Sequence, residues 1–198
     1  MKKIYNFSKN INPEHVSNEM DFGINVQDRI ILSDPQIDLL SLGNFILRCR
    51  TIINQSGDDK SDLNYVISSY GGDVFSALGI IDSIRMLKQK VNTIGIGPIM
   101  SAAVPMLASG TGKRSITRNS VVMIHPVSVN GSGSALDLTN DVAQAKQSQD
   151  KMSELLGKFS TQPASFWKRK ASTNFYITPE QCLSFGLVDE IIDDQHES

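Results

Sequence analysis

The sequence predicts an α/β domain built from parallel βαβ units. Short apolar segments of strand character alternate with longer segments whose apolar residues recur at helical spacing. This alternation runs from residue 29 to residue 192 without a repeat or a linker that would divide the chain. Because such alternation favours parallel strands joined by crossover helices, we expect one domain over residues 21–193. An N-terminal arm (1–20) and a short tail (194–198) would flank it.

Hydrophobic periodicity places the individual strands and helices along the chain. The spacing predicts strands over residues 29–32, 63–67, 91–96, 121–124 and 187–192. It predicts helices over residues 36–53, 74–88, 101–108, 135–159 and 178–185, the last with Thr178 as N-cap and Pro179 in the first turn. The helix over 135–159 has a polar middle, so it is not expected to be a uniform core helix.

Composition excludes several classes of protein. The chain has 198 residues, 40% of them hydrophobic and 20% charged, which suits a well-packed core. Its 19 basic and 21 acidic residues form no long Lys/Arg run of the kind that binds nucleic acid. No run approaches the roughly 18 apolar residues of a membrane helix, and Lys2 and Lys3 are not followed by the apolar region of a secretory signal. We therefore expect a cytoplasmic protein whose two cysteines, Cys49 and Cys182, are free buried thiols.

Ser101 and His125 are the two residues most suggestive of chemistry. Ser101 follows an apolar strand at a predicted strand-to-helix junction, where free backbone N–H groups offer the donors that an oxyanion needs. The plainer interpretation of Ser101 is a helix N-cap. His125 ends a hydrophobic run, where an imidazole is costly unless it is used or satisfied, and it is alternatively a hydrogen-bonded structural residue. If the two meet in space, they form a candidate serine hydrolase site.

Gly71 and Gly72 form a glycine pair after the second predicted strand. The pair is either a simple turn or a place where backbone approaches a ligand closely. It does not match the spacing of dinucleotide-binding or P-loop motifs. The glycine pair becomes informative about function because it belongs to an ordered set of features along the chain: strand, glycine turn, helix, strand, serine, strand and histidine.

That ordered set resembles the ClpP proteolytic subunits of the caseinolytic (Clp) protease family. The turn Ser68–Asp73 resembles the family's Asn-Ser-Pro-Gly-Gly motif, with Tyr70 in the place of proline, and Gly97–Ala103 lies where the family has its nucleophile motif. Further matching segments are Asp28–Leu32, Gly112–Arg114, Asn119–Ser120, Val122–Pro126, Tyr176–Gln181 and Phe185–Ile191. The resemblance covers most of the chain, from about Gly23 to Ile192.

The resemblance implies a fold and an activity. The fold would be ClpP/crotonase-like, made of repeated ββα-type units with a protruding handle over residues 127–160. The activity would be that of an ATP-dependent Clp protease proteolytic subunit, a serine endopeptidase that cleaves unfolded polypeptides inside an oligomeric chamber. Ser101 would be the nucleophile and His125 the general base. The backbone N–H groups of Gly72 and Ala102 would form the oxyanion hole.

The same resemblance implies partners. Asn130, Gly131, Ser132, Gly133 and Ser134 would bind peptide by strand addition. The chain would associate with itself in heptameric rings, two of which would stack through the long helix into a tetradecamer. An AAA+ unfoldase is a further expected partner. No metal, cofactor, nucleic acid or membrane is implied.

The carboxylate of the family's catalytic triad is missing at its expected place. The stretch Lys170–Phe175 contains no Asp or Glu, and counting back from Phe175 puts Thr173 at the aspartate position, with Ser172 or Asn174 as other equivalents. Ala103 stands where the family has glycine, and Pro105 falls in the first turns of the next helix. Two alternatives stay open: an impaired ring subunit or assembly protein that keeps the fold, and a crotonase-like acyl-CoA enzyme, for which Asp73 is the one carboxylate beside the glycine pair.

Overall fold

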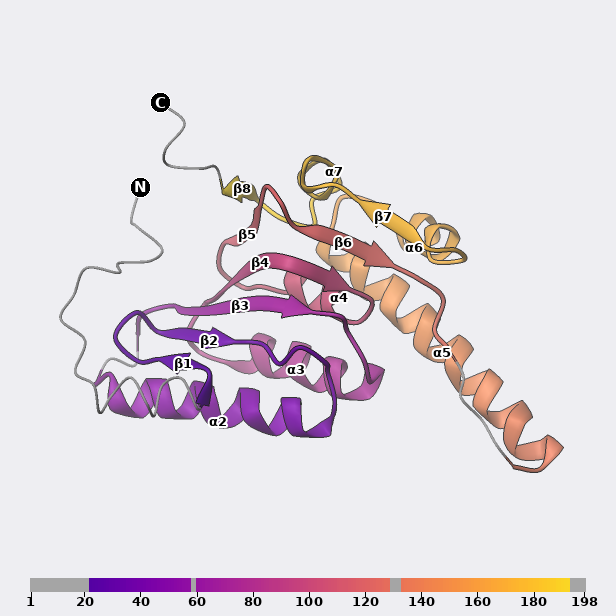
Figure 1. The fold of residues 1–198 in the computed structure, drawn as a ribbon, viewed down its shortest axis with the longest axis horizontal. Coiled ribbons are helices and arrows are strands. Elements are labelled where there is room, and N and C mark those ends of the chain that lie inside the picture. The colour runs from indigo at the N-terminus through magenta and orange to yellow at the C-terminus, as the bar shows by residue number, and fades with distance from the viewer. Residues whose placement is uncertain (1–21, 58–59, 129–132, 193–198) are drawn as a thin grey trace.

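A computed structural model describes residues 22–57, 60–128 and 133–192, so the predicted arm and tail lie outside the described residues. Within these ranges the chain forms an eight-stranded sheet with helices packed against it (Figure 1). The strands are β1 (Ile24–Asn25), β2 (Ile30–Leu32), β3 (Leu63–Ser69), β4 (Val91–Met100), β5 (Arg114–Thr117), β6 (Val121–Ile124), β7 (Phe175–Ile177) and β8 (Glu190–Ile192). The helices are α2 (Leu39–Gln55), α3 (Val74–Met86), α4 (Ala103–Ala108), α5 (Ala135–Phe159), α6 (Ala164–Lys170) and α7 (Pro179–Ser184).

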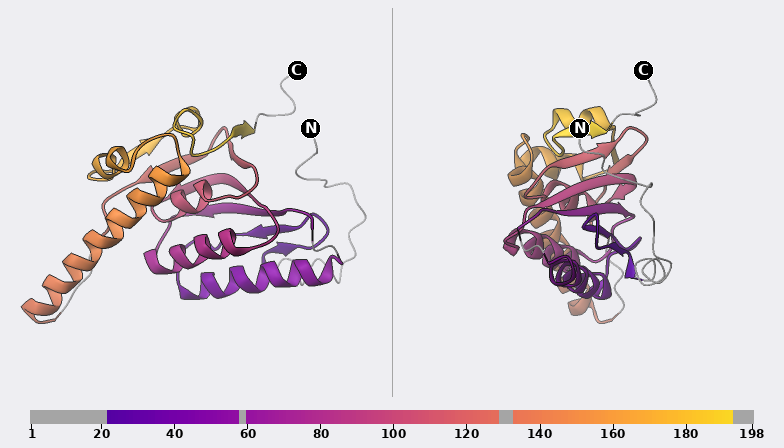
Figure 2. Two further views of the ribbon diagram at one scale, coloured as in Figure 1. Left: turned by 180° about the vertical axis from the view of Figure 1, so that it is seen from behind. Right: turned by 90° about the vertical axis from the view of Figure 1, so that its left-hand side faces the viewer.

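The centre of the sheet is parallel, as predicted. Strands β2, β3, β4 and β5 lie in that order, each parallel to the next, and α2, α3 and α4 connect them. Crossovers of one hand that advance in one direction along a sheet place their helices on one face. Helices α2, α3, α4 and the inner end of α5 accordingly lie together on one side of the sheet (Figure 2).

Strand β4 changes its neighbour halfway along its length. Its first half pairs with β5, at Thr93–Gly95, and its second half pairs with β6, at Pro98–Met100. The change coincides with a register shift against β3 and with Gly97, whose φ of 69° is readily adopted by glycine. The strand therefore continues to Met100, four residues beyond its predicted end, and its last residue lies beside Met123 of β6.

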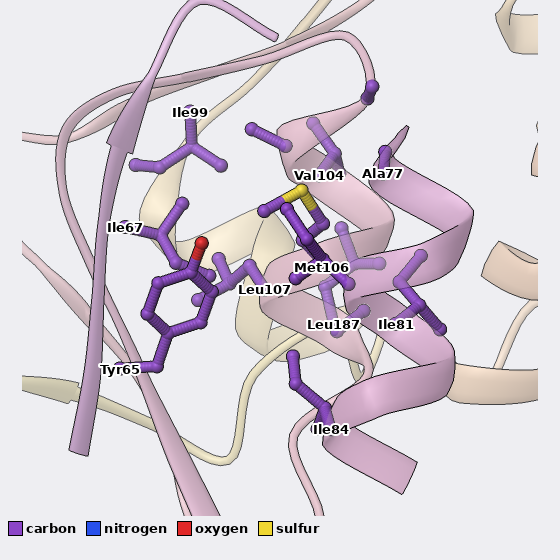
Figure 3. Close-up of a cluster of buried hydrophobic side chains, with 14 of the residues drawn as sticks. Tyr65, Ile67, Ala77, Ile81, Ile84, Ile99, Val104, Met106, Leu107 and Leu187 are labelled. Atoms are coloured by element: carbon purple, nitrogen blue, oxygen red, sulfur yellow. The ribbon is translucent and has the colours of Figure 1, made fainter. Parts of the chain in front are cut away.

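The main core fills the space between the sheet and helices α3 and α4. Figure 3 shows side chains of α3 and α4 meeting those of β3 and β4 in one cluster. Its labelled members are Tyr65, Ile67, Ala77, Ile81, Ile84, Ile99, Val104, Met106, Leu107 and Leu187. Since each is nearly inaccessible to solvent, the two helices that begin beside the glycine turn and beside Ser101 are held firmly on the sheet.

Helix α5 has a buried inner end and an exposed outer end. It covers the 25 residues predicted to be helical, starting at a capping box formed by Ser134 and Asp137. Residues 135–144 are exposed, whereas Met152 and Leu156 are buried in the core. The outer end extends away from the body of the molecule (Figure 1). The prediction that this helix is not a uniform core helix is confirmed.

Four elements were not predicted from the sequence: β1, β5, β7 and α6. Strand β7 pairs antiparallel with β6, matching Val122 with Ile177 and Ile124 with Phe175. Helix α6 carries the buried Trp167, whose Nε1 donates to Ser160 Oγ at 2.9 Å. Such short elements depend on tertiary packing rather than on their own periodicity.

Helix α2 begins later than the spacing predicts. Residues 36–38 precede it, because Asp38 caps the helix by accepting from Ser41 N at 2.8 Å. Ile37 instead forms an isolated parallel bridge with Gly72. The first residues of the predicted helix therefore support the glycine turn.

Both cysteines are free and buried, as predicted. Burial raises the pKa of the Cys49 and Cys182 thiols to about 12, so neither is a thiolate near neutral pH. Among the described residues, none of the helices combines the length and apolar character needed to cross a bilayer.

Candidate active site

Ser101 lies in the tight turn between β4 and α4. Its φ of 55° is in the left-handed region, which is rare for a residue with a side chain and is often found at functional sites. Helix α4 begins at Ala103, and its N-cap is Ala102, which makes no side-chain capping bond. The interpretation of Ser101 as a helix N-cap is therefore wrong. The amide of Ser101 donates to Met123 O at 2.7 Å, which ties the turn to β6.

The glycine turn packs directly against Ser101. A Cβ built on Gly71 would lie 2.6 Å from Met100 O and 2.7 Å from Ser101 Cβ, and Gly71 has a φ of 85°. A Cβ on Gly72 would collide with Ile37 O. Ile37 N donates to Gly71 O at 2.8 Å and Asp73 N donates to Ile37 O at 2.8 Å. Both glycines are thus required for the close approach of three backbone segments.

Two backbone amides beside Ser101 have no acceptor. Among the described residues, neither the N–H of Gly72 nor that of Ala102 donates a hydrogen bond to another residue. Gly72 lines the same cavity as Ser101, and Ala102 follows Ser101 at the start of α4. Unpaired N–H groups beside a hydroxyl are the donors that would stabilise an oxyanion.

His125 lies at the same edge of the sheet as Ser101. It follows β6, and β4 and β6 run parallel with Met100 beside Met123, so both strands end together. Ser101 and His125 both line a cavity of about 630 Å³, and both also line a second, smaller pocket. In the described structure no hydrogen bond joins the two side chains, which is common in a site without substrate.

The comparison with known families decides what this site belongs to. The model of the Clp protease family matches residues 20–195. The chain belongs to the Clp protease family. It is also 28% identical over 174 residues to the ATP-dependent Clp protease proteolytic subunit of Deinococcus radiodurans, an alignment that covers 87% of this chain and 84% of that protein. The predicted α/β fold of the Clp protease type and the assignment as a ClpP-like serine peptidase are confirmed.

The third residue of the Clp protease triad has no clear equivalent in the geometry. Thr173 and Asn174 are both exposed, and in the described structure neither bonds to His125 or lines either pocket. Ile124 pairs with Phe175, so the next residue on each strand would put Asn174 opposite His125. Ser172 Oγ donates to Arg169 O at 2.7 Å and is already engaged.

Two other departures from the Clp protease pattern do not disturb the fold. Ala103 is fully buried at the first residue of α4. Pro105 falls in the first turn of that helix, where its missing N–H has no intrahelical acceptor to lose.

The walls of the cavity include residues that sequence reasoning did not single out as site residues. Tyr70 and Phe75, which flank the glycine pair in the chain, line the cavity, and one face of α5 lines it as well. The α5 residues are Asp141, Gln144, Ala145 and Ser148. Their spacing in the chain shows that they share a helix face, but it does not reveal which element that face meets.

Two remaining predictions concern segments around this cavity. Of the predicted substrate-binding residues, Asn130, Gly131 and Ser132 lie outside the described residues, while Ser134 caps α5 and Gly133 precedes it. Asp73, the carboxylate considered for acyl-CoA chemistry, caps α3 and accepts from Ser76 N at 2.8 Å and Ser76 Oγ at 2.6 Å. Its capping role accounts for this carboxylate without acyl-CoA chemistry.

Proposed function

We propose that this chain is the proteolytic subunit of an ATP-dependent protease and cleaves unfolded polypeptides with Ser101 and His125. The observation that carries the proposal is one cavity lined by Ser101, by His125 and by Gly72, whose N–H has no acceptor among the described residues. Membership of the Clp protease family supports the same assignment.

The geometry supports a conventional acyl-transfer mechanism. His125 takes the proton of Ser101 as Oγ attacks the peptide carbonyl. The N–H groups of Gly72 and Ala102 then donate to the oxyanion of the tetrahedral intermediate. His125 passes its proton to the leaving amine, and a water molecule later hydrolyses the acyl-enzyme by the same steps.

A third residue would orient the imidazole of His125. We propose Thr173 or Asn174 for this position, the first from the family motif and the second from the strand register. Each would offer an uncharged oxygen to the imidazole N–H. Neither would stabilise the imidazolium by charge, so turnover is expected to be slower than with an aspartate.

Labelling with a fluorophosphonate probe tests the nucleophile. The assembled protein is expected to react at Ser101, whereas Ser101→Ala is expected not to react. Ser184→Ala is the matched control, because Ser184 lies in α7 and its hydroxyl donates to Gln181 O, away from the cavity. Absence of labelling in assembled protein would contradict the proposal and favour an impaired ring subunit.

We also propose that the chain assembles into heptameric rings that stack in pairs through α5. Support comes from the exposed outer half of this helix, which presents Leu136 and Val142 at 69% and 60% exposure. Apolar side chains on a projecting helix favour burial against another subunit. Sedimentation should show two stacked rings for the wild type, and smaller species after Leu136→Glu with Val142→Glu. A monomeric wild type would contradict ring assembly.

We propose that a separate unfoldase hydrolyses ATP to unfold the protein substrates of this chain. The relative from Deinococcus radiodurans is named as the proteolytic subunit of an ATP-dependent protease. We expect short peptides to be hydrolysed without ATP, and folded proteins to be degraded only when an AAA+ partner and ATP are added. The expected cytoplasmic location belongs to this proposal, since the partner needs a supply of ATP.

A further inference from the structure

The cavity beside Ser101 is acidic on its described walls. Asp73 and Asp141 line it, and none of its lining residues is a Lys or Arg. Ser76 engages Asp73 as the cap of α3. Asp141 is exposed and makes no hydrogen bond or ion pair with any residue that the structure describes. Of the two carboxylates that line the cavity, Asp141 is therefore the one with no partner among the described residues.

Two aromatic side chains that line the same cavity as Asp141 suit a cation with an aliphatic stem. Tyr70 and Phe75 line the cavity and are 66% and 59% exposed. An aromatic ring face attracts an ammonium or guanidinium group, and its apolar surface packs against methylene groups. Tyr70 is also a departure from the family motif, which has proline at this position.

The helix geometry sets how far Asp141 lies from the catalytic residues. Gln149 lines the small pocket that is also lined by Ser101 and His125. Asp141 lies two helical turns nearer the outer end of α5. At about 1.5 Å of rise per residue, Gln149 and Asp141 are about 12 Å apart along the helix axis. An extended peptide advances about 3.3 Å per residue, so about three to four residues span this distance.

We infer that the cavity selects peptides with a lysine or arginine three or four residues from the scissile bond. Asp141 pairs with the cationic group, while Tyr70 and Phe75 pack against its stem. The inference rests on the proposed peptidase function, because the peptide is placed with its scissile bond at Ser101.

Binding to the inactive Ser101→Ala protein tests this selectivity without turnover. Two fluorescent peptides are compared by anisotropy on the assembled protein, one with lysine and one with norleucine at the selected position. The lysine peptide is expected to bind about three- to tenfold more tightly at low salt, and the advantage should shrink at high salt. Equal affinities would overturn the inference.

Asp141→Asn and Glu154→Gln, each added to Ser101→Ala, form a matched pair of variants. Both remove an exposed carboxylate from α5, but Glu154 does not line the cavity. Asp141→Asn is expected to bring the two peptides within about twofold of each other, and Glu154→Gln should leave the lysine preference unchanged. A preference that survives Asp141→Asn would overturn the assignment of Asp141.

The binding experiment tests the cationic subsite and the labelling experiment tests the peptidase function, so either proposal can be contradicted without the other. A lysine preference that depends on Asp141, together with no fluorophosphonate labelling of the wild type, would support the cationic subsite and contradict the peptidase. Labelling without a lysine preference would support the peptidase and contradict the subsite.

Discussion

A Cβ atom on Gly71 would lie 2.7 Å from the Cβ of Ser101, so the glycine turn and the turn that carries Ser101 leave space for only one side chain. The contact explains why the glycine pair and the serine belong to one site although they come from different strands. Ser101 can occupy its position because Gly71 has no side chain and because the Ser101 amide donates a hydrogen bond to Met123 O of β6.

Replacing this glycine is expected to damage both stability and activity. In Gly71→Ala the new methyl group would meet the Met100 carbonyl, and an L residue would have to adopt a φ of 85°. We expect a loss of about 2 kcal/mol in unfolding free energy and at least a tenfold slower acylation. Urea unfolding and the rate of fluorophosphonate labelling measure the two effects.

Gly43→Ala provides the control for that substitution. Gly43 is inside α2, and beyond its chain neighbours and the helix's own backbone no atom of the described residues lies within 4 Å of a Cβ built on it. Because alanine is a better helix former than glycine, this variant should gain up to about 1 kcal/mol and keep its labelling rate. Wild-type labelling by Gly71→Ala would show that the turn tolerates a side chain.

A carboxylate at the third triad position is expected to raise turnover. In Thr173→Asp the new charge would stabilise the imidazolium of His125, and peptide hydrolysis should rise at least about tenfold. A nearby carboxylate also raises the pKa of an imidazole, so the acidic limb of the pH profile should move to higher pH.

Asn174→Asp distinguishes the two candidates for that position. If the strand register rather than the family motif identifies the third residue, the gain and the pH shift will appear in Asn174→Asp instead. No gain in either variant would mean that His125 works without a third side chain.

The Arg114–Asp189 pair should make stability depend on acid pH. Arg114 Nη1 donates to Phe159 O at 2.6 Å and to Ala108 O at 3.3 Å, which ties together the ends of α5 and α4, and the side chain pairs with Asp189. Burial alone would raise the pKa of Asp189, but the hydrogen bonds from Arg114 outweigh it, and the pKa is lowered from 3.8.

A carboxyl group with a lowered pKa stabilises the fold above its unfolded-state pKa, and that contribution is lost as pH falls through its folded-state value. We expect Asp189→Asn to lose about 1 kcal/mol at pH ~7, a modest value because the carboxylate is partly exposed. The deficit should shrink below pH ~4 in urea unfolding curves. A deficit independent of pH would contradict a charge-based role, and Glu154→Gln is again the control.

Apart from β5, the parallel strands and the long helices could be predicted because their apolar residues form a recognisable local pattern. Helix α5 is predictable at its observed bounds since its capping residue Ser134 and its apolar positions are local signals. Strands β5 and β7, of four and three residues, carry too few positions to show a period, and pairing partners hold them in place. The sequence suggests a helix N-cap at Ser101 because serine is a common N-cap residue. The left-handed φ of Ser101 cannot be recognised from the residue type.

By itself, the sequence determined the parallel α/β architecture, the family motifs and the order of the glycine pair, Ser101 and His125. Only the tertiary structure decided that β4 leaves β5 for β6 at Gly97, which brings Ser101 and His125 into one cavity. It also decided that the face of α5 carrying Asp141 lines that cavity. Periodicity reports which face of an element is buried, whereas the partner of that face is chosen by packing summed over many elements.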